Sequence, residues 1–315
     1  MKQKWKDESG QTMVLFTLML TILIGVLALV IDYGMPTWTA RRLQNAADSA
    51  ALAAATMLPA DSAEREAIAR TEAIEYATKN GYSNADVTFP DTTTVKVIVN
   101  TTVEYSFAKI FGLTSVDLER SASAQIQAIT SLRGVVPLSV EKSVLDAALS
   151  SENYYLTLKF GGGAGNNGAY GAIDLDGSNG GGASQYKDRL INGYDGLVTV
   201  GDLLPTENGN MSGPTERGVQ QRYNACTHYT SSGGCTPEHY DKTCPRVMMI
   251  PVVVYTANHT VQIKGFAPFL LDSYHGSGNE CYVYGTYLPS FITDGEVDPS
   301  IPANPYGPYT VKLVG

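Results

Sequence analysis

The chain has 315 residues and a formal net charge of −9, with 17% of its residues charged and 43% hydrophobic. An acidic chain without an extended Lys- and Arg-rich region neutralises a phosphate backbone poorly, so nucleic acid is not an expected partner. The length allows a membrane anchor followed by one or two domains with cores of their own.

An apolar run near the N-terminus predicts a membrane-spanning helix. Val14 to Ile31 is 18 residues long and carries no charge, with Leu20 and Gly25 inside it. At about 1.5 Å rise per residue, this run nearly crosses a hydrocarbon core of about 30 Å. A cleaved secretory signal is the alternative, but its apolar region usually spans about 7 to 15 residues and ends at small residues, whereas Asp32 follows here. We therefore expect an uncleaved anchor that contains Val14, Leu20, Gly25 and Ile31.

Charges on the two sides of this run predict its orientation. Lys2, Lys4 and Lys6 precede it, whereas Arg41 and Arg42 lie well beyond its end. Because positive residues tend to stay on the cytoplasmic side, we expect the N-terminus in the cytoplasm. The chain is then a single-pass protein of the cell membrane, with its C-terminal domain on the extracytoplasmic side.

An alanine-rich helix is predicted directly after the anchor. Pro36 lacks an amide proton and crowds the preceding turn, so we expect a kink between Gly34 and Pro36. The helix then resumes with a narrow face of small apolar side chains, whose neighbour is either the chain's own domain or a helix of another subunit. The residues of this face are Leu43, Ala46, Ala47, Ala50, Ala54 and Met57.

The segment of residues 9–57 resembles a known family. It contains Ser-Gly-Gln, an apolar run that closes on an aspartate, and Arg-Leu-Gln-Asn-Ala-Ala-Asp followed by further alanines. In these respects it is similar to the N-terminal segment of TadE/TadG-like proteins, which help assemble the tight-adherence (Flp-type) pilus. The resemblance implies that the helix contacts pilins or other pilus machinery proteins as well as the lipid bilayer. It is carried by Gly10, Gln11, Asp32, Arg42, Leu43, Gln44, Ala46, Ala47 and Asp48.

Two departures limit what this resemblance implies. Type IV-like prepilins resemble one another in a glycine cleavage site with Glu at the fifth mature position, and counting from Gly10 that position is Leu15. We therefore expect that Gly10 is not a processing site and that the chain stays in the membrane as an accessory protein. Many longer family members also resemble a von Willebrand A domain downstream, but this chain has no Asp-x-Ser-x-Ser metal motif.

The residues after the stalk predict a small α+β unit. Asp61 to Glu64 is a capping pattern for a helix that runs to Asn80 and stops at Gly81. Three strands follow, and a short helix or turn precedes the third. The strands are predicted at Val87 to Phe89, Val95 to Tyr105 and Val116 to Ile126.

The distal part of the chain predicts a β-rich domain, so that the whole is of the α+β class. Gly, Asn, Ser and Tyr become frequent and separate short apolar runs. A helix is predicted between Gly182 and Gly193, and a hairpin at Ala257 to His259. The strands are predicted at residues 154–160, 170–175, 246–256, 260–271 and 281–292.

Catalytic motifs are absent from the sequence apart from one short match. Ser139 to Lys142 matches Ser-x-x-Lys of penicillin-binding enzymes, but the accompanying Lys-Thr-Gly is missing. The other interpretation of this match is a capped first turn of a helix. We expect no catalytic residue and no cofactor.

An acidic turn raises the question of calcium. Asp174, Asp176 and Asn179 place oxygen atoms around a glycine turn, which suits this cation. The bidentate glutamate expected at the twelfth position is replaced by Gln185. A surface turn stabilised by Asx hydrogen bonds is the other interpretation, and the sequence leaves the choice open.

Four cysteines and four histidines occur in the distal part. In an oxidising compartment we expect disulfides, and we favour Cys226 with Cys235 and Cys244 with Cys281 among three possible connectivities. A zinc site is the alternative, but the cysteine spacings match no common zinc module, so no metal site is expected. The histidines are His228, His239, His259 and His275.

Two functions are compatible with the sequence. The first is a non-enzymatic, minor pilin-like structural or assembly component of a Tad/Flp-type pilus, which presents a domain at the cell surface for adhesion to a ligand or for assembly contacts. The second is a membrane-tethered extracellular hydrolase without a recognisable motif. The absence of a complete catalytic motif favours the first. Its expected parts are a cytoplasmic tail (1–11), the transmembrane helix and stalk (12–57), a small pilin-like α+β unit (58–131) and a β-rich extracytoplasmic domain (132–315).

Overall fold

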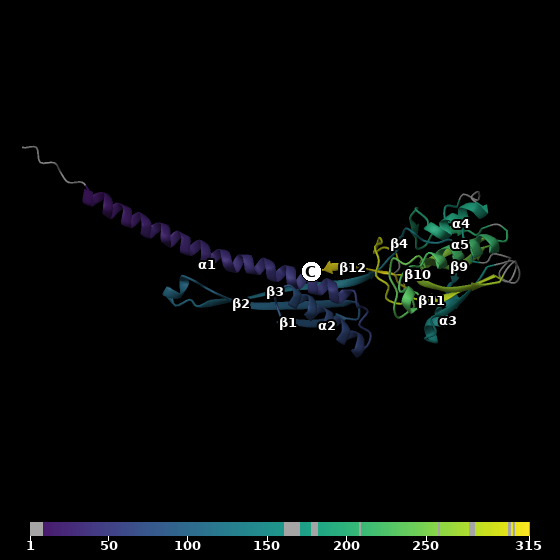
Figure 1. Ribbon diagram of the computed structural model, residues 1–315, viewed down its shortest axis with the longest axis horizontal. Coiled ribbons are helices and arrows are strands. Elements are labelled where there is room, and N and C mark those ends of the chain that lie inside the picture. The colour runs from purple at the N-terminus through teal and green to yellow at the C-terminus, as the bar shows by residue number, and fades with distance from the viewer. Residues whose placement is uncertain are drawn as a thin grey trace, which may run out of the picture. The chain divides into compact units, whose positions relative to one another are not determined.

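The computed structural model describes residues 9–160, 171–177, 182–207, 209–257, 259–276, 281–301, 304 and 306–314. The chain divides into two compact units (Figure 1). Unit 1 contains Met1–Ile126 and Val311–Gly315, and unit 2 contains Gln127–Thr310. Unit 2 is therefore an insertion between two segments of unit 1.

Unit 1 begins with one long helix, α1 (Ser9–Ala55). It continues through Pro36, and Figure 1 shows it as a single, gently curved helix. The expected kink therefore does not interrupt the helix. The stretch Thr12–Ala55 is long and apolar enough to cross a membrane, and its most apolar window has a mean hydropathy of 3.0 with no part buried by the rest of the protein.

The second half of α1 packs on α2 (Ala63–Lys79) and on a four-stranded sheet. The hydroxyl of Ser62 caps α2 by accepting from the N–H of Arg65 at 3.3 Å, and Gly81 follows the helix with a φ of +91°. The sheet has the order β1-β2-β3-β12. Its strands are β1 (Ala85–Asp91), β2 (Thr94–Glu104), β3 (Ser115–Ala128) and β12 (Tyr309–Val314), with the short helix η1 (Ala108–Phe111) between β2 and β3.

Unit 2 is built on a sheet of order β5-β9-β10-β11-β6, with β8 also paired to β10. The pairs are antiparallel except for β5 with β9, which is parallel. Figure 1 shows α4 and α5 side by side next to this sheet. The strands are β4 (Ser131–Leu132), β5 (Val140–Glu141), β6 (Tyr155–Phe160), β7 (Val198–Thr199), β8 (Leu203–Pro205), β9 (Val247–Ala257), β10 (Thr260–His275) and β11 (Cys281–Tyr287); the helices are α3 (Lys142–Ser150), α4 (Gly182–Asn192), α5 (Ser212–Asn224) and η3 (Thr230–Ser232).

Buried side chains lie on both faces of β10. Phe269 and Leu271 belong to the main core of unit 2, whereas Leu270 packs in a smaller cluster with Leu288 and Phe291. Successive strand residues point to opposite faces, so these two clusters lie on opposite sides of the sheet.

The expected α+β class is confirmed by these elements. The predicted helices and strands of residues 61–126 all form, and β9, β10, β11 and α4 form near their predicted positions. The expected strand at 170–175 is wrong, because its described residues make only isolated bridges at Ala172 and Ile173. Asn258, at the tip of the expected β9–β10 hairpin, lies outside the described residues, although the two strands do pair antiparallel.

Candidate functional site

The first half of α1 exposes its apolar side chains. The expected anchor residues Val14, Leu20, Gly25 and Ile31 are all exposed, and Leu29 is 72% exposed. A continuous apolar surface of this extent is unfavourable in water and is the surface that a helix presents to lipid. The structure therefore supports the expected anchor by its exposure as well as its composition.

Asp32 connects the end of this apolar run to the rest of unit 1. Its carboxylate accepts hydrogen bonds from the main-chain N–H groups of Ser106, Phe107 and Ala108, at 2.7, 2.9 and 2.5 Å. These amides stand at the start of η1, where a helix lacks internal acceptors for its first N–H groups. The signature aspartate therefore fixes the β2–β3 connection beside α1.

Residues 107–113 of the β2–β3 connection are strongly apolar, and we call them the tip. Ile110 is 81% and Phe111 86% exposed, and Phe107 and Leu113 are exposed as well. A group of exposed large apolar side chains marks a contact with a membrane or with another protein. Because Asp32 follows the apolar run directly, the tip lies at the level of one end of that run.

The signature residues in the second half of α1 make contacts within unit 1. Leu43, Ala46 and Ala47 are fully buried where α1 packs against α2 and β2. The amide of Gln44 donates to Asp48 at 2.8 Å and to the carbonyl of Ser121 in β3 at 3.2 Å. Of the two neighbours left open by the sequence, the face of small side chains therefore packs on the chain's own domain.

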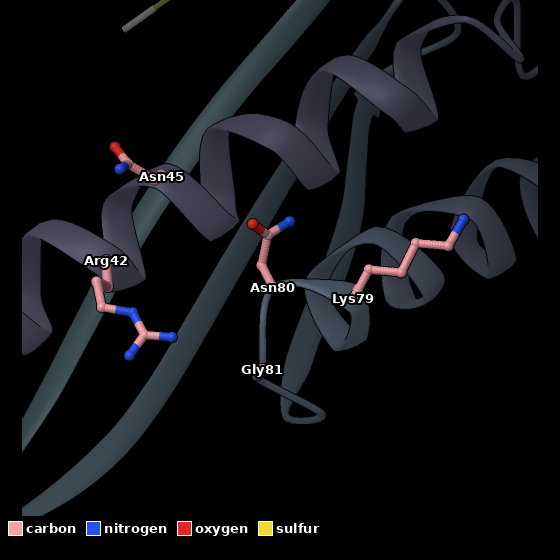
Figure 2. Close-up of a pocket in the computed structure, with 5 residues that line it drawn as sticks. All are labelled: Arg42, Asn45, Lys79, Asn80 and Gly81. Carbon is pink, nitrogen blue, oxygen red and sulfur yellow. The ribbon is translucent and has the colours of Figure 1, made fainter.

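Arg42 extends from α1 toward the end of α2 (Figure 2). Its guanidinium lies over the Trp38 ring, 4.7 Å from the centroid, and its Nη2 lies 3.9 Å from where a Cβ on Gly81 would be. A positive charge just beyond the C-terminal end of α2 is favoured by the helix dipole. We therefore assign Arg42 to the docking of the two helices. It lines a shallow pocket of about 330 Å³ with Asn45, Lys79, Asn80 and Gly81.

Four side chains of unit 2 converge between the end of α5 and the start of β9. Cys226, His228, Cys235 and Cys244 place one potential metal-binding atom each within 4.8 Å of all the others. The Sγ atom of Cys226 lies 3.3 Å from that of Cys244 and 3.9 Å from that of Cys235. Three sulfurs and one imidazole nitrogen are a donor set for a borderline-soft metal ion.

The surroundings shift the pKa values of two of these thiols in opposite directions. Burial disfavours the Cys226 thiolate, but hydrogen bonds from the main chain of Cys235 and His228 and from the Cys244 thiol lower its pKa to about 6. Burial, together with the neighbouring Cys226, raises the pKa of Cys244 to about 12. The two thiols titrate as one system, because the first thiolate makes the second proton harder to remove. Of these two thiols, Cys226 is therefore the one that ionises first.

Neither expected disulfide is formed in the structure, in which all four cysteines are free. Cys281 packs in the main core with Phe269 and Val283, whereas Cys244 packs with Leu270 in the smaller cluster. Phe269 and Leu270 face opposite sides of the sheet, which separates Cys244 from Cys281. The sequence placed no metal ligand here because the spacing of ligands in an irregular segment does not report their distance in space.

Arg189 occupies the centre of the acidic turn considered for calcium. Its guanidinium donates to Asp174 at 3.3 Å and to Asp176, and its side chain is 9% exposed. Gln185 donates to Asp176 at 3.3 Å. An arginine therefore supplies the positive charge that this turn requires, while residues 178–181, including Asn179, lie outside the described residues.

Glu207 lies next to this turn, with its main-chain N–H bonded to the carbonyl of Ala172 at 3.0 Å. Burial, the largest cause, and the carboxylate of Asp174 together raise the pKa of its carboxyl to about 6, although Arg189 acts in the opposite direction. The ionised form of Glu207 is therefore disfavoured in the folded protein.

Ser139 and Lys142 do not form a nucleophile and base pair. The Ser139 hydroxyl donates to the carbonyl of Gly171 at 3.0 Å, and Lys142 forms an ion pair with Asp146. Lys142 is the first residue of α3, in agreement with the interpretation as a first helical turn; the expected cap is wrong, because Glu141 precedes α3 and makes no side-chain capping hydrogen bond.

Comparison with known proteins finds one family. Residues 10–57 match the model of a family described as putative Flp pilus-assembly TadE/G-like. The match covers most of α1 and the turn that follows it. No curated protein and no solved structure matches the chain. The matched segment indicates a role related to pilus assembly.

Replacing Asp32 by alanine is expected to release the tip. The three main-chain N–H groups that donate to Asp32 lose their acceptor. Their hydrogen exchange should therefore become about tenfold faster. The measurement is hydrogen–deuterium exchange, by mass spectrometry, of peptides from residues 105–113 in the full chain in detergent micelles. Asp86→Ala, at an exposed position of β1, is the control. Equal exchange in both variants would show that Asp32 does not hold the tip.

Replacing Glu207 by glutamine is expected to stabilise the chain in a pH-dependent way. The folded pKa of about 6 exceeds the ordinary value of 4.5. The folded state therefore binds more protons between these values, and stability falls as pH rises through this window. Glu207→Gln removes this loss. Relative to the wild type, the variant should therefore gain more free energy of unfolding at pH 8 than at pH 4. The difference between the two gains should be less than about 1 kcal/mol, because the site is partly exposed.

The measurement is chemical denaturation of the full chain at both pH values, with Glu152→Gln, an exposed substitution, as the control. A gain for Glu207→Gln at pH 4 as large as that at pH 8 would contradict the assigned cause.

Proposed function

We propose that the chain is a membrane-anchored, minor pilin-like structural or assembly component of a Tad/Flp-type pilus. The observation that carries the proposal is that residues 10–57, which match the pilus-assembly family, form α1 with two different surfaces. Its first half exposes apolar side chains over its whole circumference, and its second half packs on the sheet of unit 1. The exposed half can contact lipid and the helices of pilins or other pilus proteins, and small-residue positions such as Gly25 allow close approach of another helix.

The proposed arrangement places the N-terminus in the cytoplasm and the residues after the anchor on the extracytoplasmic side. There unit 2 presents its surface for adhesion or for contacts with other pilus proteins. Leu15 at the position of the guiding glutamate supports retention of the full chain, without cleavage after Gly10. The separate partners of Ser139 and Lys142 give no support to a hydrolase.

The tip extends the membrane contact in this proposal. Ile110 and Phe111 are exposed, and Asp32 holds their loop beside the end of the apolar run. Burial of these side chains at the headgroup level is favourable by the hydrophobic effect. We therefore propose that the tip contacts a lipid surface.

Deletion of the gene is expected to abolish surface pili, and the wild-type chain should restore them. A variant with residues 14–31 in reversed order keeps the length and composition of the span, so it should enter the membrane. It should nevertheless restore few pili, because the surface of the helix is changed. The measurements are pilus counts by electron microscopy and the amount of chain in the membrane fraction.

Normal piliation in the deletion strain would refute the pilus role. If the variant with the reversed segment restored the full number of pili, the first half of α1 would serve only as an anchor.

Phe111→Trp is expected to report contact of the tip with lipid. In a chain whose own Trp5 and Trp38 are replaced by phenylalanine, the introduced indole should be quenched by lipids brominated near the headgroup. Ile68→Trp, at an exposed position of α2, which packs on the second half of α1, is the control and should be quenched much less. The measurement is fluorescence of the full chain in liposomes, and equal quenching at both positions would contradict a lipid contact of the tip.

A further inference from the structure

The segment that contains Cys226, His228, Cys235 and Cys244 has little regular structure of its own. It begins after α5 ends at Asn224 and reaches β9 at Val247, and η3 is its one short helix among the described residues. A connection of this length without regular elements needs some other source of order. Its four chemically reactive side chains nevertheless meet at one point.

The backbone of this segment bends so that the four side chains turn inward. Tyr229 has a φ of +52°, and Gly233 and Gly234 have φ values of +87° and +98°. Turns of this kind reverse the chain between His228 and Cys235. Thr236 and His239 then exchange main-chain hydrogen bonds, N–H to carbonyl, at 3.0 and 3.1 Å.

Arg246 attaches this segment to the sheet. Its side chain is 7% exposed, and its guanidinium donates to the carbonyl of Cys235 at 3.1 Å and to that of Leu271 in β10 at 2.6 Å. This buried cation also lies next to the cluster, where it offsets the negative charge of thiolates.

The distances between the sulfurs fit a metal centre better than a disulfide. A disulfide needs about 2.05 Å between sulfurs, whereas Cys226 Sγ lies 3.3 Å from Cys244 Sγ and 3.9 Å from Cys235 Sγ. Four ligands placed tetrahedrally about 2.3 Å from a zinc ion have sulfurs roughly 3.7 Å apart. The two observed values lie on either side of that separation.

His228 supplies the fourth donor, through a ring nitrogen that has no hydrogen-bond partner. Its Nδ1 atom is buried and has no hydrogen-bond partner, which is costly for a polar atom and is found for no other side-chain nitrogen or oxygen of the described residues. Its Nε2 atom faces the carboxylate of Asp241 at 4.0 Å. Metal-binding histidines commonly direct their second ring nitrogen to a carboxylate, which sets the tautomer.

We propose that Cys226, His228, Cys235 and Cys244 bind one zinc ion as a structural site of unit 2. Zinc accepts one electron pair from each of three thiolates and from Nδ1 of His228. Three thiol groups ionise for this, and binding to the fully protonated neutral cluster releases three protons. The four ligands close the tetrahedron, so the ion organises the segment and has no open position for catalysis. The proposal is independent of the pilus role of α1.

Zinc and oxidation compete for the same sulfurs. A disulfide between Cys226 and Cys244 would remove two of the four ligands; it would form by exchange with the disulfide of an oxidised dithiol, which takes up the two electrons and two protons and leaves as two thiols. Bound zinc protects these thiolates, because their lone pairs are committed to the metal. The two states of the cluster therefore exclude each other, and they are distinguished by metal content and by disulfide mapping.

The test is the metal content of the full chain, purified in detergent without added metal or chelator. We expect about one zinc per chain in the wild type and in Cys281→Ser, whose cysteine lies outside the cluster. Cys235→Ser and His228→Ala should lower zinc occupancy several-fold. Cobalt exchanged into the wild type should give the visible bands of a tetrahedral thiolate site.

A second measurement uses only the wild-type chain, because a variant can fail to fold. A chelator should increase alkylation of Cys226, Cys235 and Cys244 and leave that of buried Cys281 unchanged. Wild-type chain without zinc, or with a disulfide between any two of the three cluster cysteines, would overturn the proposal. Equal zinc in His228→Ala and the wild type would remove His228 from the site.

Discussion

The burial of a narrow alanine face of α1 is the interaction on which unit 1 depends. Ala47, Ala50 and Ala54 have no side chain beyond Cβ, so the helix axis can lie close to α2 and β2. The same helix is apolar around its circumference before Asp32. One continuous element therefore has two different surfaces, an exposed apolar one and one buried in a packed core. The carboxylate of Asp32 stands at the boundary, where the tip amides satisfy its charge.

Local signals predict unit 1 well. The capping pattern of Asp61 to Glu64, the stop at Gly81 and the alternating valines of β2 are short-range patterns, and each predicts an observed element. The cap itself is Ser62, one residue later than the Asp61 of the predicted pattern. The spacing of the alanine face predicted a contact but not the contacting surface, because spacing describes only one of two partners. Helix α5 was not predicted, because it buries residues such as Pro214, Thr215 and Gly218, which give no apolar stripe.

In unit 2 the sequence could not predict which side chains meet, because those side chains are far apart along the chain. Cys281 lies in a strand with clear alternation, yet the assignment of its partner required knowing which face of β10 each cysteine approaches. The cluster around Cys226 depends on left-handed turns at Tyr229 and Gly234 in a segment without periodicity. An export compartment favours disulfides in general, but the positions of the four side chains favour a metal.

The pairing of β12 with β3 has a consequence for biogenesis. Residues 311–314 are made after all of unit 2, so the edge of β3 stays unpaired until synthesis of unit 2 is complete. During that interval the chain presents an open strand edge. An open edge can accept a strand from another chain. Completion of the sheet by β12 closes this edge, so the time between synthesis of β3 and of β12 is a window in which another chain's strand can pair there.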